Sequence, residues 1–581
     1  MTEAVTTEAD GGRQPSRVIR ALKALKDRRM AAMLLLSFAA SLPYGAVLGV
    51  LTAWLTEENV GPAVIGALSL ATIGYAFKYL WAPAFQRARD IPLFRLGGRR
   101  SWLVLLQILI AVLLAVLAFS NPAQNIGVVA VIAFAITILS PTHDIVLDAW
   151  RIEVARSEED KDLMSALYQF GYKFGGLISG FVALMMAARI GWVAVYIMLA
   201  AFMLLSVVGS LLAPEPETEE SVTGRRERPS FQPAIPGNLA RGAIAFVSLC
   251  WLAAFLMIGN FVVGSLILDT GVKGHTFVSH QGPVIVALTV LVPALVAAYL
   301  LFSQKAEARM VDLAEVPHKP GDALTNTLFR AIFDPLMDLI YRLRWGVILV
   351  LALALTYRFT DAVWGSFAYA FYMGQNFGAL GHSPDDVAIA SKFFGVIATI
   401  LGSLVGVIAI TVVGRMPVFF VGGILAAVTN LLYADLAVGG AHVDAFLAVT
   451  HLDVPLVAFA NWAAEIQPKD IVIPPDQGQR MARLMVTIFA ENIAGGLALV
   501  AVTAYLTSVV NPRFAAVQYA LLASLTMLIG TLGKPWLGEL METRGFYHVF
   551  IMTFWLGGIA VVLSAIEWVR QAHLARTAER V

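Results

Sequence analysis

Long apolar runs separated by short polar segments dominate the pattern of this chain. The runs long enough to cross a bilayer as helices cover residues 30–55, 63–85, 101–119, 126–149, 163–187, 191–213, 242–264, 283–303, 345–372, 386–413, 417–438, 484–510, 514–538 and 547–569. The pattern predicts an all-α polytopic membrane protein with 14 transmembrane helices, grouped along the chain as six, two and six.

The polar segments predict the domain boundaries. We expect a first bundle at 30–213, a linker at 214–241, two extra helices at 242–303, an amphipathic segment at 304–344 and a second bundle at 345–570. Residues 1–29 are basic, with apolar positions at helical spacing from residue 16, which predicts an interfacial helix. The second bundle contains a long insert at 439–483, and residues 571–581 form a tail.

Lys and Arg gather in alternate loops, and this predicts the orientation. Residues 86–100 hold five of them and residues 304–344 hold six, whereas 56–62, 120–125 and 374–385 hold none. Both termini are therefore expected in the cytoplasm. The insert 439–483 is expected outside despite Lys469, Arg480 and Arg483, because long loops cross largely regardless of charge.

The two groups of six runs look like copies of each other. Gly98-Arg99-Arg100 follows the second run of the first group, and Gly414-Arg415-Met416 follows the second run of the other. Six-plus-six parallel repeats around a cytoplasmic linker are the plan of the major facilitator fold. The extra pair 242–264 and 283–303 contains no charged residue, so we expect it outside the transport path.

The composition agrees with a membrane protein and excludes several function classes. The chain is 59% hydrophobic and 14% charged, against about 25% charged in soluble proteins. The net charge of +1 does not suggest nucleic-acid binding, and a single cysteine, Cys250, excludes an internal disulfide and a cysteine metal cluster. No P-loop or soluble-enzyme motif occurs, and His442 and His451 lack the spacing of a helical zinc pair.

Ionisable residues inside the apolar runs are the candidate functional residues, because each is costly in hydrocarbon. Asp144 and Asp148 lie four apart and share a helix face, next to His143 and Arg151. The alternative is that this helix ends here and Asp148 and Arg151 lie among the headgroups. The other candidates are Lys78, Lys173, Arg358, Asp361, Lys392, Asp435, Glu491 and Lys534, with Asn492 beside Glu491.

Structural roles stay open for some of these residues. Arg358 and Asp361 are three apart and could form a structural ion pair. Asp435 lies near an outer helix end and could be interfacial, and Lys534 could reach the outer surface with its long side chain. Aromatic residues such as Trp54 and Tyr172 could stack on sugar rings, although such residues more often pack or anchor.

In the major facilitator fold, helices 1, 4, 7 and 10 of twelve line the central cavity. The acids Asp144, Asp361 and Glu491 fall on helices 4, 7 and 10, and the lysines Lys78, Lys173, Lys392 and Lys534 fall on the flanking helices 2, 5, 8 and 11. A cavity of both signs suits an anionic or zwitterionic solute. Lys or Arg can hold a carboxylate, and a carboxylate in low dielectric can carry a coupling proton.

Several stretches resemble the anhydromuropeptide permease family, a major facilitator branch of Gram-negative inner membranes. They are Phe38–Pro43 with Ala53–Thr56, Phe77-Lys78-Tyr79-Leu80-Trp81-Ala82-Pro83, Asp144–Trp150, Gly171-Tyr172-Lys173, Tyr357–Ala362, Lys392 with Ala398–Ile400, and Glu491-Asn492 before Gly495-Gly496. The likeness covers residues 30–214 and 345–570. It departs from the fold's usual Asp-Arg at the start of the 2–3 loop, where this chain has Gln86-Arg87.

The resemblance implies a proton-driven importer of N-acetylglucosaminyl-1,6-anhydro-N-acetylmuramyl peptides. Such import feeds peptidoglycan recycling and, in some bacteria, β-lactamase induction. We expect a multi-pass inner-membrane monomer in contact with lipid, driven by the proton gradient, with no cofactor, metal, nucleic acid or enzyme activity. The expected substrate-binding residues are Trp54, Lys78, Tyr172, Lys173, Arg358, Lys392 and Asn492; the proton-coupling residues are Asp144, Asp148, Asp361 and Glu491; the gating residues are Arg87, Arg99 and Arg100.

Three other functions remain open from the sequence. The same fold could carry another bulky anion, such as an acyl-CoA-like solute. A membrane-embedded transferase could use residues 143–148 at one interface without net flux. A sensor that does not transport would leave the convergence of charges at mid-membrane unexplained.

Overall fold

The computed structural model describes residues 27–81, 96–156, 158–215, 230–232, 237–268, 270–303, 309–311, 323–465, 476–511 and 514–578. The described residues form helices and their connections, apart from two short strands. Strands β1 (Ser230–Gln232) and β2 (Arg309–Val311) pair antiparallel, with Ser230 opposite Val311. Most of the predicted interfacial helix, the linker 214–241 and Arg87 lie outside the described residues.

The first bundle, here called the N-half, covers residues 28–212. Its helices are α2 (Arg28–Gly45), α3 (Leu51–Glu57), α4 (Pro62–Leu68), α5 (Ile73–Phe77), α7 (Gly98–Ala118), α8 (Ile126–Val154), α9 (Glu158–Leu177) and α10 (Ala183–Leu212). Turns of π-helix at Ala46–Val50 and Ile178–Val182, and 3-10 turns at Ser69–Thr72 and Lys78–Leu80, join some of them into longer rods.

The second bundle, here called the C-half, covers residues 346–578. Its helices are α16 (Gly346–Thr356), α17 (Phe359–Trp364), α18 (Ala368–Met373), α19 (Pro384–Val387), α20 (Gly395–Val413), α21 (Arg415–Val428), α22 (Asn430–Ala437), α23 (Ala441–Thr450), α24 (Asp453–Glu465), α25 (Gln477–Val509) and α26 (Ala515–Ala578). A π-helical segment at Ala388–Phe394 joins α19 to α20.

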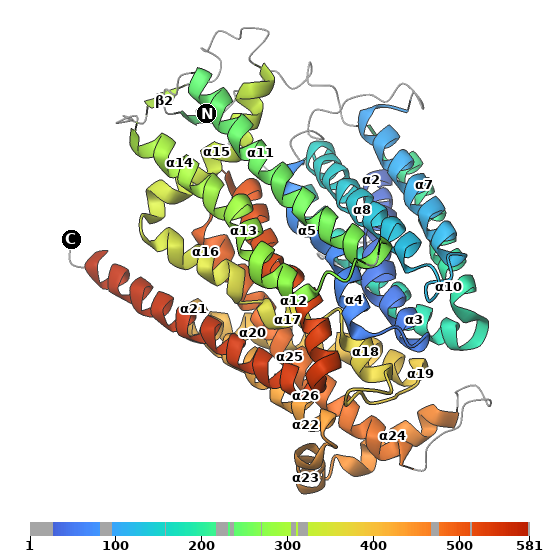
Figure 1. Ribbon diagram of the computed structural model, residues 1–581. Coiled ribbons are helices and arrows are strands. Elements are labelled where there is room, and N and C mark those ends of the chain that lie inside the picture. The colour runs from blue at the N-terminus through green and yellow to red at the C-terminus, as the bar shows by residue number, and fades with distance from the viewer. Residues whose placement is uncertain are drawn as a thin grey trace, which may run out of the picture.

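Between the halves in sequence come the extra helices. They are α11 (Gly237–Val262), α12 (Gly274–Thr276), α13 (Gly282–Val286), α14 (Val292–Ser303) and α15 (Ala323–Leu343), with π-helical segments at Val263–Ile267, Phe277–Gln281 and Ala287–Leu291. Figure 1 shows α11–α14, in green, lying across the face of the two bundles. Phe255 of α11 packs against Phe77 of the N-half with ring centroids 5.2 Å apart, and Asp338 of α15 accepts a 2.8 Å hydrogen bond from Asn511.

Within the described residues, ten helical segments are long and apolar enough to cross a membrane, or up to twelve if each of two bent pairs is one span. The segments Phe170–Leu212 and Val517–Thr577 each turn back at a glycine of positive φ, Gly191 and Gly545, a conformation that suits glycine because it lacks a Cβ. With both arms of these two segments, the short apolar helix Pro62–Phe77 and the bent segment at 346–361, each predicted run contains helix within the described residues. The all-α multi-pass architecture is confirmed.

Small residues bring the helices close together, as expected where packing rather than water drives association. A Cβ at Gly402 would lie 2.2 Å from the carbonyl oxygen of Ile493, so α20 and α25 touch through their backbones. A Cβ at Gly66 would lie 2.5 Å from the carbonyl oxygen of Lys534, which joins α4 to α26 across the two halves. The halves also meet where α3 contacts α18 and where the π-helical segments Ile178–Val182 and Ala388–Phe394 touch.

Candidate functional site

Helix α8 supplies the acids of the N-half. Asp148 forms an ion pair with Arg151 at 3.1 Å, one turn along the helix. Asp144 lies a turn deeper and is nearly buried, and one of its carboxyl oxygens has no hydrogen-bond partner in the described chain. Lys78 acts electrostatically on Asp148 from the adjoining helix. Four predicted residues of both charge signs are therefore gathered on one side of the N-half.

Tyrosines surround Asp144. Its carboxylate acts electrostatically on the hydroxyls of Tyr75 on α5 and of Tyr168 and Tyr172 on α9. The rings of Tyr168 and Tyr172 lie 5.9 Å apart, and Arg151 lies over the Tyr168 ring at 5.2 Å. The acid is thus enclosed by flat surfaces that carry hydroxyl groups, an arrangement suited to sugar rings.

Behind Asp144, a buried hydrogen-bonded chain runs into the N-half. His143 is 1% exposed, and its Nε2 lies 3.3 Å from Nε2 of Gln107 on α7. The Ser210 hydroxyl donates to Oε1 of Gln107 at 2.7 Å. In this arrangement Gln107 donates to His143, so the proton of a neutral imidazole sits on Nδ1, which is 3.9 Å from Asp144.

The C-half holds a second cluster of charges on α17, α25 and the π-helical segment before α20. Arg358 and Asp361 form an ion pair at 3.4 Å. Glu491 lies next to Asp361 and Lys392, which both act on it electrostatically, and the Tyr433 hydroxyl hydrogen-bonds to it. Asn492 donates to Glu491 at 2.7 Å and accepts from Thr399 at 2.8 Å, which orients the acid.

A small polar cavity lies at the acids of the C-half. It is lined by Thr360, Asp361, Ala426, Thr429, Asn430, Tyr433, Glu491 and Gly495. Its volume of about 10 Å³ is close to the smallest that holds one water molecule. Glu491 and Asp361 therefore both border a space with room for about one water molecule.

The two clusters approach each other between the halves. Arg358 of the C-half acts electrostatically on Tyr44 of α2 in the N-half. Lys392 lies over the Tyr369 ring at 4.9 Å, and its stem passes against Gly180 of the N-half, 3.0 Å from where a Cβ would stand. The predicted residues that the structure gathers in these clusters are Lys78, Asp144, Asp148, Tyr172, Arg358, Asp361, Lys392, Glu491 and Asn492.

Other predicted residues lie elsewhere. Trp54 stacks on Trp192 with centroids 6.3 Å apart and belongs to the packing of the N-half. Lys173 is exposed beside Phe170 and Phe174, which are also exposed. Lys534 is 3% exposed and hydrogen-bonds to Thr72 at 3.3 Å, so it does not reach the surface.

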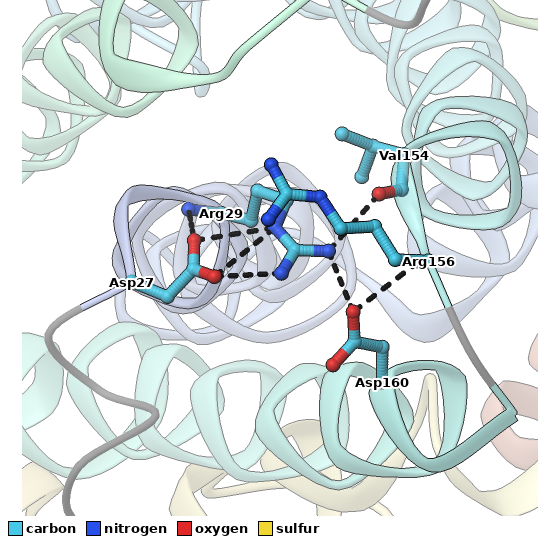
Figure 2. A network of polar contacts seen from close by, with 5 residues as sticks. All are labelled: Asp27, Arg29, Val154, Arg156 and Asp160. Atoms are coloured by element: carbon cyan, nitrogen blue, oxygen red, sulfur yellow. Dashed lines mark hydrogen bonds and ion pairs between the residues drawn. The ribbon is translucent and has the colours of Figure 1, made fainter.

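The gating residues also have defined positions, except Arg87. Arg99 forms an ion pair with Glu153 at 2.5 Å, and Arg100 donates to the Leu211 carbonyl at 2.9 Å. Arg29, which the sequence reading placed in the interfacial helix, is instead buried at the start of α2. Figure 2 shows its guanidinium between Asp27 and Asp160, bonded at 2.6 Å to each, with Val154 and Arg156 alongside. The hydrogen bonds from Arg29 hold the pKa of Asp27 below its ordinary value.

Some site residues were not predicted from the sequence. Tyr75, Tyr433 and Gln107 are polar groups inside apolar runs, which was the only signal available, and aromatic residues there are commonly packing residues. Asp385 and Arg189 lie near helix ends, where charges are ordinary. Only the fold shows that these last two residues meet.

Polar contacts join the halves at one end of the molecule, where residues 58–61, Gly191, residues 375–383 and Gly545 lie. We call it the outer end, because the charge pattern predicts that it faces outward. There Arg189 pairs with Asp385 at 3.0 Å, and Glu542 accepts from the Ala63 amide at 2.8 Å. At the opposite end, the described ion pairs Arg29–Asp160 and Arg99–Glu153 lie inside one half. The conformation is closed at the outer end.

Comparisons with known proteins agree with this fold. The family model described as Major Facilitator Superfamily matches residues 33–314. A POT family transporter solved with 5-aminolevulinic acid is 14% identical, with a TM-score of 0.53 over 93% of this chain and 95% of that one. The nucleoside transporter NupG is 10% identical, with a TM-score of 0.52 over 92% and 99%. The chain is therefore a multi-pass membrane transporter with the major facilitator fold, and not an enzyme.

Two relatives with curated names narrow the class of transporter to which this chain is related. The anhydromuropeptide permease of Escherichia coli K12 is 25% identical over 566 residues, which cover 96% of this chain and 84% of that protein. A putative transporter, AmpG 4, of Rickettsia conorii is 23% identical over 92% and 95%. The chain is thus related to the anhydromuropeptide permeases along nearly its whole length, which confirms the resemblance seen in its motifs.

Proposed function

We propose that this protein imports anhydromuropeptides across the inner membrane of a Gram-negative bacterium and couples their entry to protons. The observation that carries the proposal is the pair of charged clusters, one in each half, that approach each other between the bundles. A muropeptide offers peptide carboxylates and two sugar rings. The clusters offer cations at Lys78, Arg358 and Lys392 and tyrosine faces around Asp144.

The cations suit the peptide carboxylates of this substrate. Arginine binds a carboxylate through two parallel hydrogen bonds, and lysine binds it as a point charge. Arg358 is held by Asp361 at 3.4 Å, a long contact that a substrate carboxylate can replace. Among the described residues, Lys392 has a contact with the Tyr369 ring and a longer-range attraction to Glu491 but no ion pair, so its ammonium is available.

Two carboxylates are the best candidates for the coupling proton. Asp148 and Asp361 each form an ion pair with an arginine one turn away. In the described chain no Lys or Arg forms an ion pair with Asp144, and Glu491 is held by the neutral groups of Tyr433 and Asn492. A charged acid without a close cation is costly at membrane depth, so protonation there is coupled to what else fills the cavity.

The closed outer end assigns this conformation a place in the transport cycle. With the predicted orientation, a conformation closed at the outer end corresponds to the step at which substrate is released to the cytoplasm. Rocking of one half against the other would break the contacts at the outer end and expose the same clusters to the outside.

The test uses purified protein in liposomes with labelled disaccharide anhydromuropeptide outside and an inward proton gradient. Uptake should occur and should collapse when an uncoupler is added. Folded protein that shows no uptake would refute the muropeptide assignment, and uptake that is indifferent to the gradient would refute the coupling.

Neutralising single acids then locates the proton. Glu491→Gln or Asp144→Asn should abolish gradient-driven accumulation yet retain exchange of labelled for unlabelled substrate, which needs no net proton movement. Asp435→Asn is the control, because Asp435 accepts from His442 at the outer end, away from both clusters. If neither Glu491 nor Asp144 is needed for accumulation, another group carries the proton.

A further inference from the structure

The insert between α22 and α25 is a bent pair of apolar helices. Helix α23 and helix α24 meet at an angle of 109°. His451 stands at the bend in the left-handed conformation, with φ 55°. The charge pattern predicted that the insert 439–483 lies outside, and its described residues 441–465 contain neither Lys nor Arg.

One face of this pair exposes large apolar side chains. Val449 is 80% exposed, Val454 68%, Trp462 56% and Phe446 51%. Ala445, Ala448, Pro455 and Ala458 lie exposed among them, so the face continues from one helix to the next. Soluble surfaces rarely present a contiguous apolar patch of this kind unless something covers it.

The carboxylate of Asp444 points the other way, into the protein. Asp444 on α23 pairs with Arg483 of α25 at 2.5 Å and accepts from Gln479 at 2.9 Å. His442 is 93% exposed and pairs with Asp435 at the end of α22 at 2.7 Å. Helix α23 is therefore tied to the bundle through Asp444, whereas the apolar face of the pair is free in the described chain.

The position of α24 shows what lies against the apolar face. Its Phe459 packs on Phe394 with ring centroids 5.2 Å apart. Phe394 lies ten residues into the span Pro384–Val413, which corresponds to about 15 Å along a helix. Beyond this contact, α20 exposes Ile397, Ile400 and Leu404, the apolar belt of a membrane-spanning helix. Helix α24 therefore meets the bundle next to the start of that belt, and Figure 1 shows α23 and α24 at the lower end of the C-half.

We infer that α23 and α24 lie in the outer interface of the bilayer, with their apolar face in lipid hydrocarbon rather than in external water. Trp462 then has the position that tryptophan prefers at membrane interfaces, and His442 marks the water side. Because α23 is tied to the first turns of α25, the pair anchors in lipid the helix that carries Glu491.

Site-directed labels test this inference in proteoliposomes. In a Cys250→Ala background, spin labels are attached to Val449→Cys and Val454→Cys, whose exposed side chains tolerate replacement. Leu404→Cys, on the lipid-facing side of α20, is the lipid reference, and Asn376→Cys, in an exposed outer loop, is the water reference. Accessibility to oxygen, which concentrates in lipid, is compared with accessibility to a water-soluble nickel complex.

The expected oxygen-to-nickel accessibility ratio at both positions is close to that of Leu404 and several-fold above that of Asn376. Ratios like that of Asn376 would place the pair in solvent and overturn the inference. Low accessibility to both reagents, with spin–spin broadening that disappears on dilution with unlabelled protein, would assign the face to a second copy and would also overturn it. Neither reading depends on which substrate is carried.

Discussion

The ion pair between Arg189 and Asp385 should control whether the outer end is closed. Arg189 belongs to the N-half and is 30% exposed, whereas Asp385 belongs to the C-half and is 1% exposed. Only one carboxyl oxygen of Asp385 is bonded, by Arg189 at 3.0 Å, and the other has no partner in the described chain. Replacing Arg189 by alanine leaves a buried carboxylate alone in the closed state but not in an open, hydrated one.

The cost of that change has a ceiling that depends on pH. The unpaired carboxylate can lose its charge by taking a proton. For an ordinary aspartate of pKa about 3.9, protonation costs about 4 kcal/mol at pH 7 and about 1.5 kcal/mol at pH 5. The closed-to-open ratio should therefore fall by up to about a thousandfold at pH 7 and about tenfold at pH 5. Asp385→Asn should cost only about 0–1 kcal/mol, because Arg189 remains partly solvated and keeps its bond to the Met185 carbonyl.

The assay measures distances between spin labels on Glu58→Cys and Asn376→Cys, exposed positions at the outer ends of the two halves. In a Cys250→Ala background, Arg189→Ala should shift the distribution to longer distances, more at pH 7 than at pH 5. The double variant Arg189→Ala with Asp385→Asn should return most of the closed population.

Two results would refute this reasoning. Equal opening by Arg189→Ala and Asp385→Asn would mean that the pair acts by simple attraction and that burial of Asp385 is unimportant. An opening that does not change between pH 5 and pH 7 would mean that the stranded carboxylate is hydrated in the closed state.

Two further predictions concern packing and hydrogen bonding in the C-half. Gly402→Ala should lower stability by about 1–3 kcal/mol or more, because the new Cβ would lie 2.2 Å from a backbone oxygen. The control Gly242→Ala has nothing within 4 Å of the new Cβ and should be neutral. Thermal unfolding in detergent measures both variants. Tyr433→Phe removes the hydroxyl that hydrogen-bonds to Glu491, so it should lower the free energy of unfolding by about 1–3 kcal/mol and slow substrate exchange. The control Tyr196→Phe loses one bond to a backbone carbonyl and should cost less and leave exchange intact. Equal effects within either pair would contradict the assigned contacts.

The acids and cations of the site were predictable because charged residues are costly, and therefore rare, in membrane-spanning apolar runs. Asp144, Asp361, Glu491 and Lys392 interrupt apolar runs where a charge needs a reason. Their partners were not predictable. Tyr433 reaches Glu491 from a helix that a twelve-helix scheme places outside the cavity, and its hydroxyl meets that of Tyr372 at 3.0 Å. A sequence gives the depth of a residue in the membrane but not the direction in which its helix faces.

Lys173 and Trp54 show the same limit, because both were predicted to bind substrate and both lie outside the two clusters. Both have the residue type and the depth expected of substrate-binding groups, yet Lys173 is exposed beside two exposed phenylalanines and Trp54 packs on Trp192. A rotation of about 100° per residue separates neighbours on a helix, because an α-helix has 3.6 residues per turn. Tyr172 and Lys173 therefore face different surroundings although they are adjacent.

The sequence by itself determined the all-α multi-pass architecture and the charges that lie within its apolar segments. These features follow from local rules, because a helix makes its own backbone hydrogen bonds and each residue has its own cost of transfer into hydrocarbon. The tertiary structure alone decided which charges meet, that the outer end is closed by Arg189 and Asp385, and that α23 and α24 lie against α25. Those facts depend on helix rotation and on contacts between segments far apart in the chain, which no local pattern encodes.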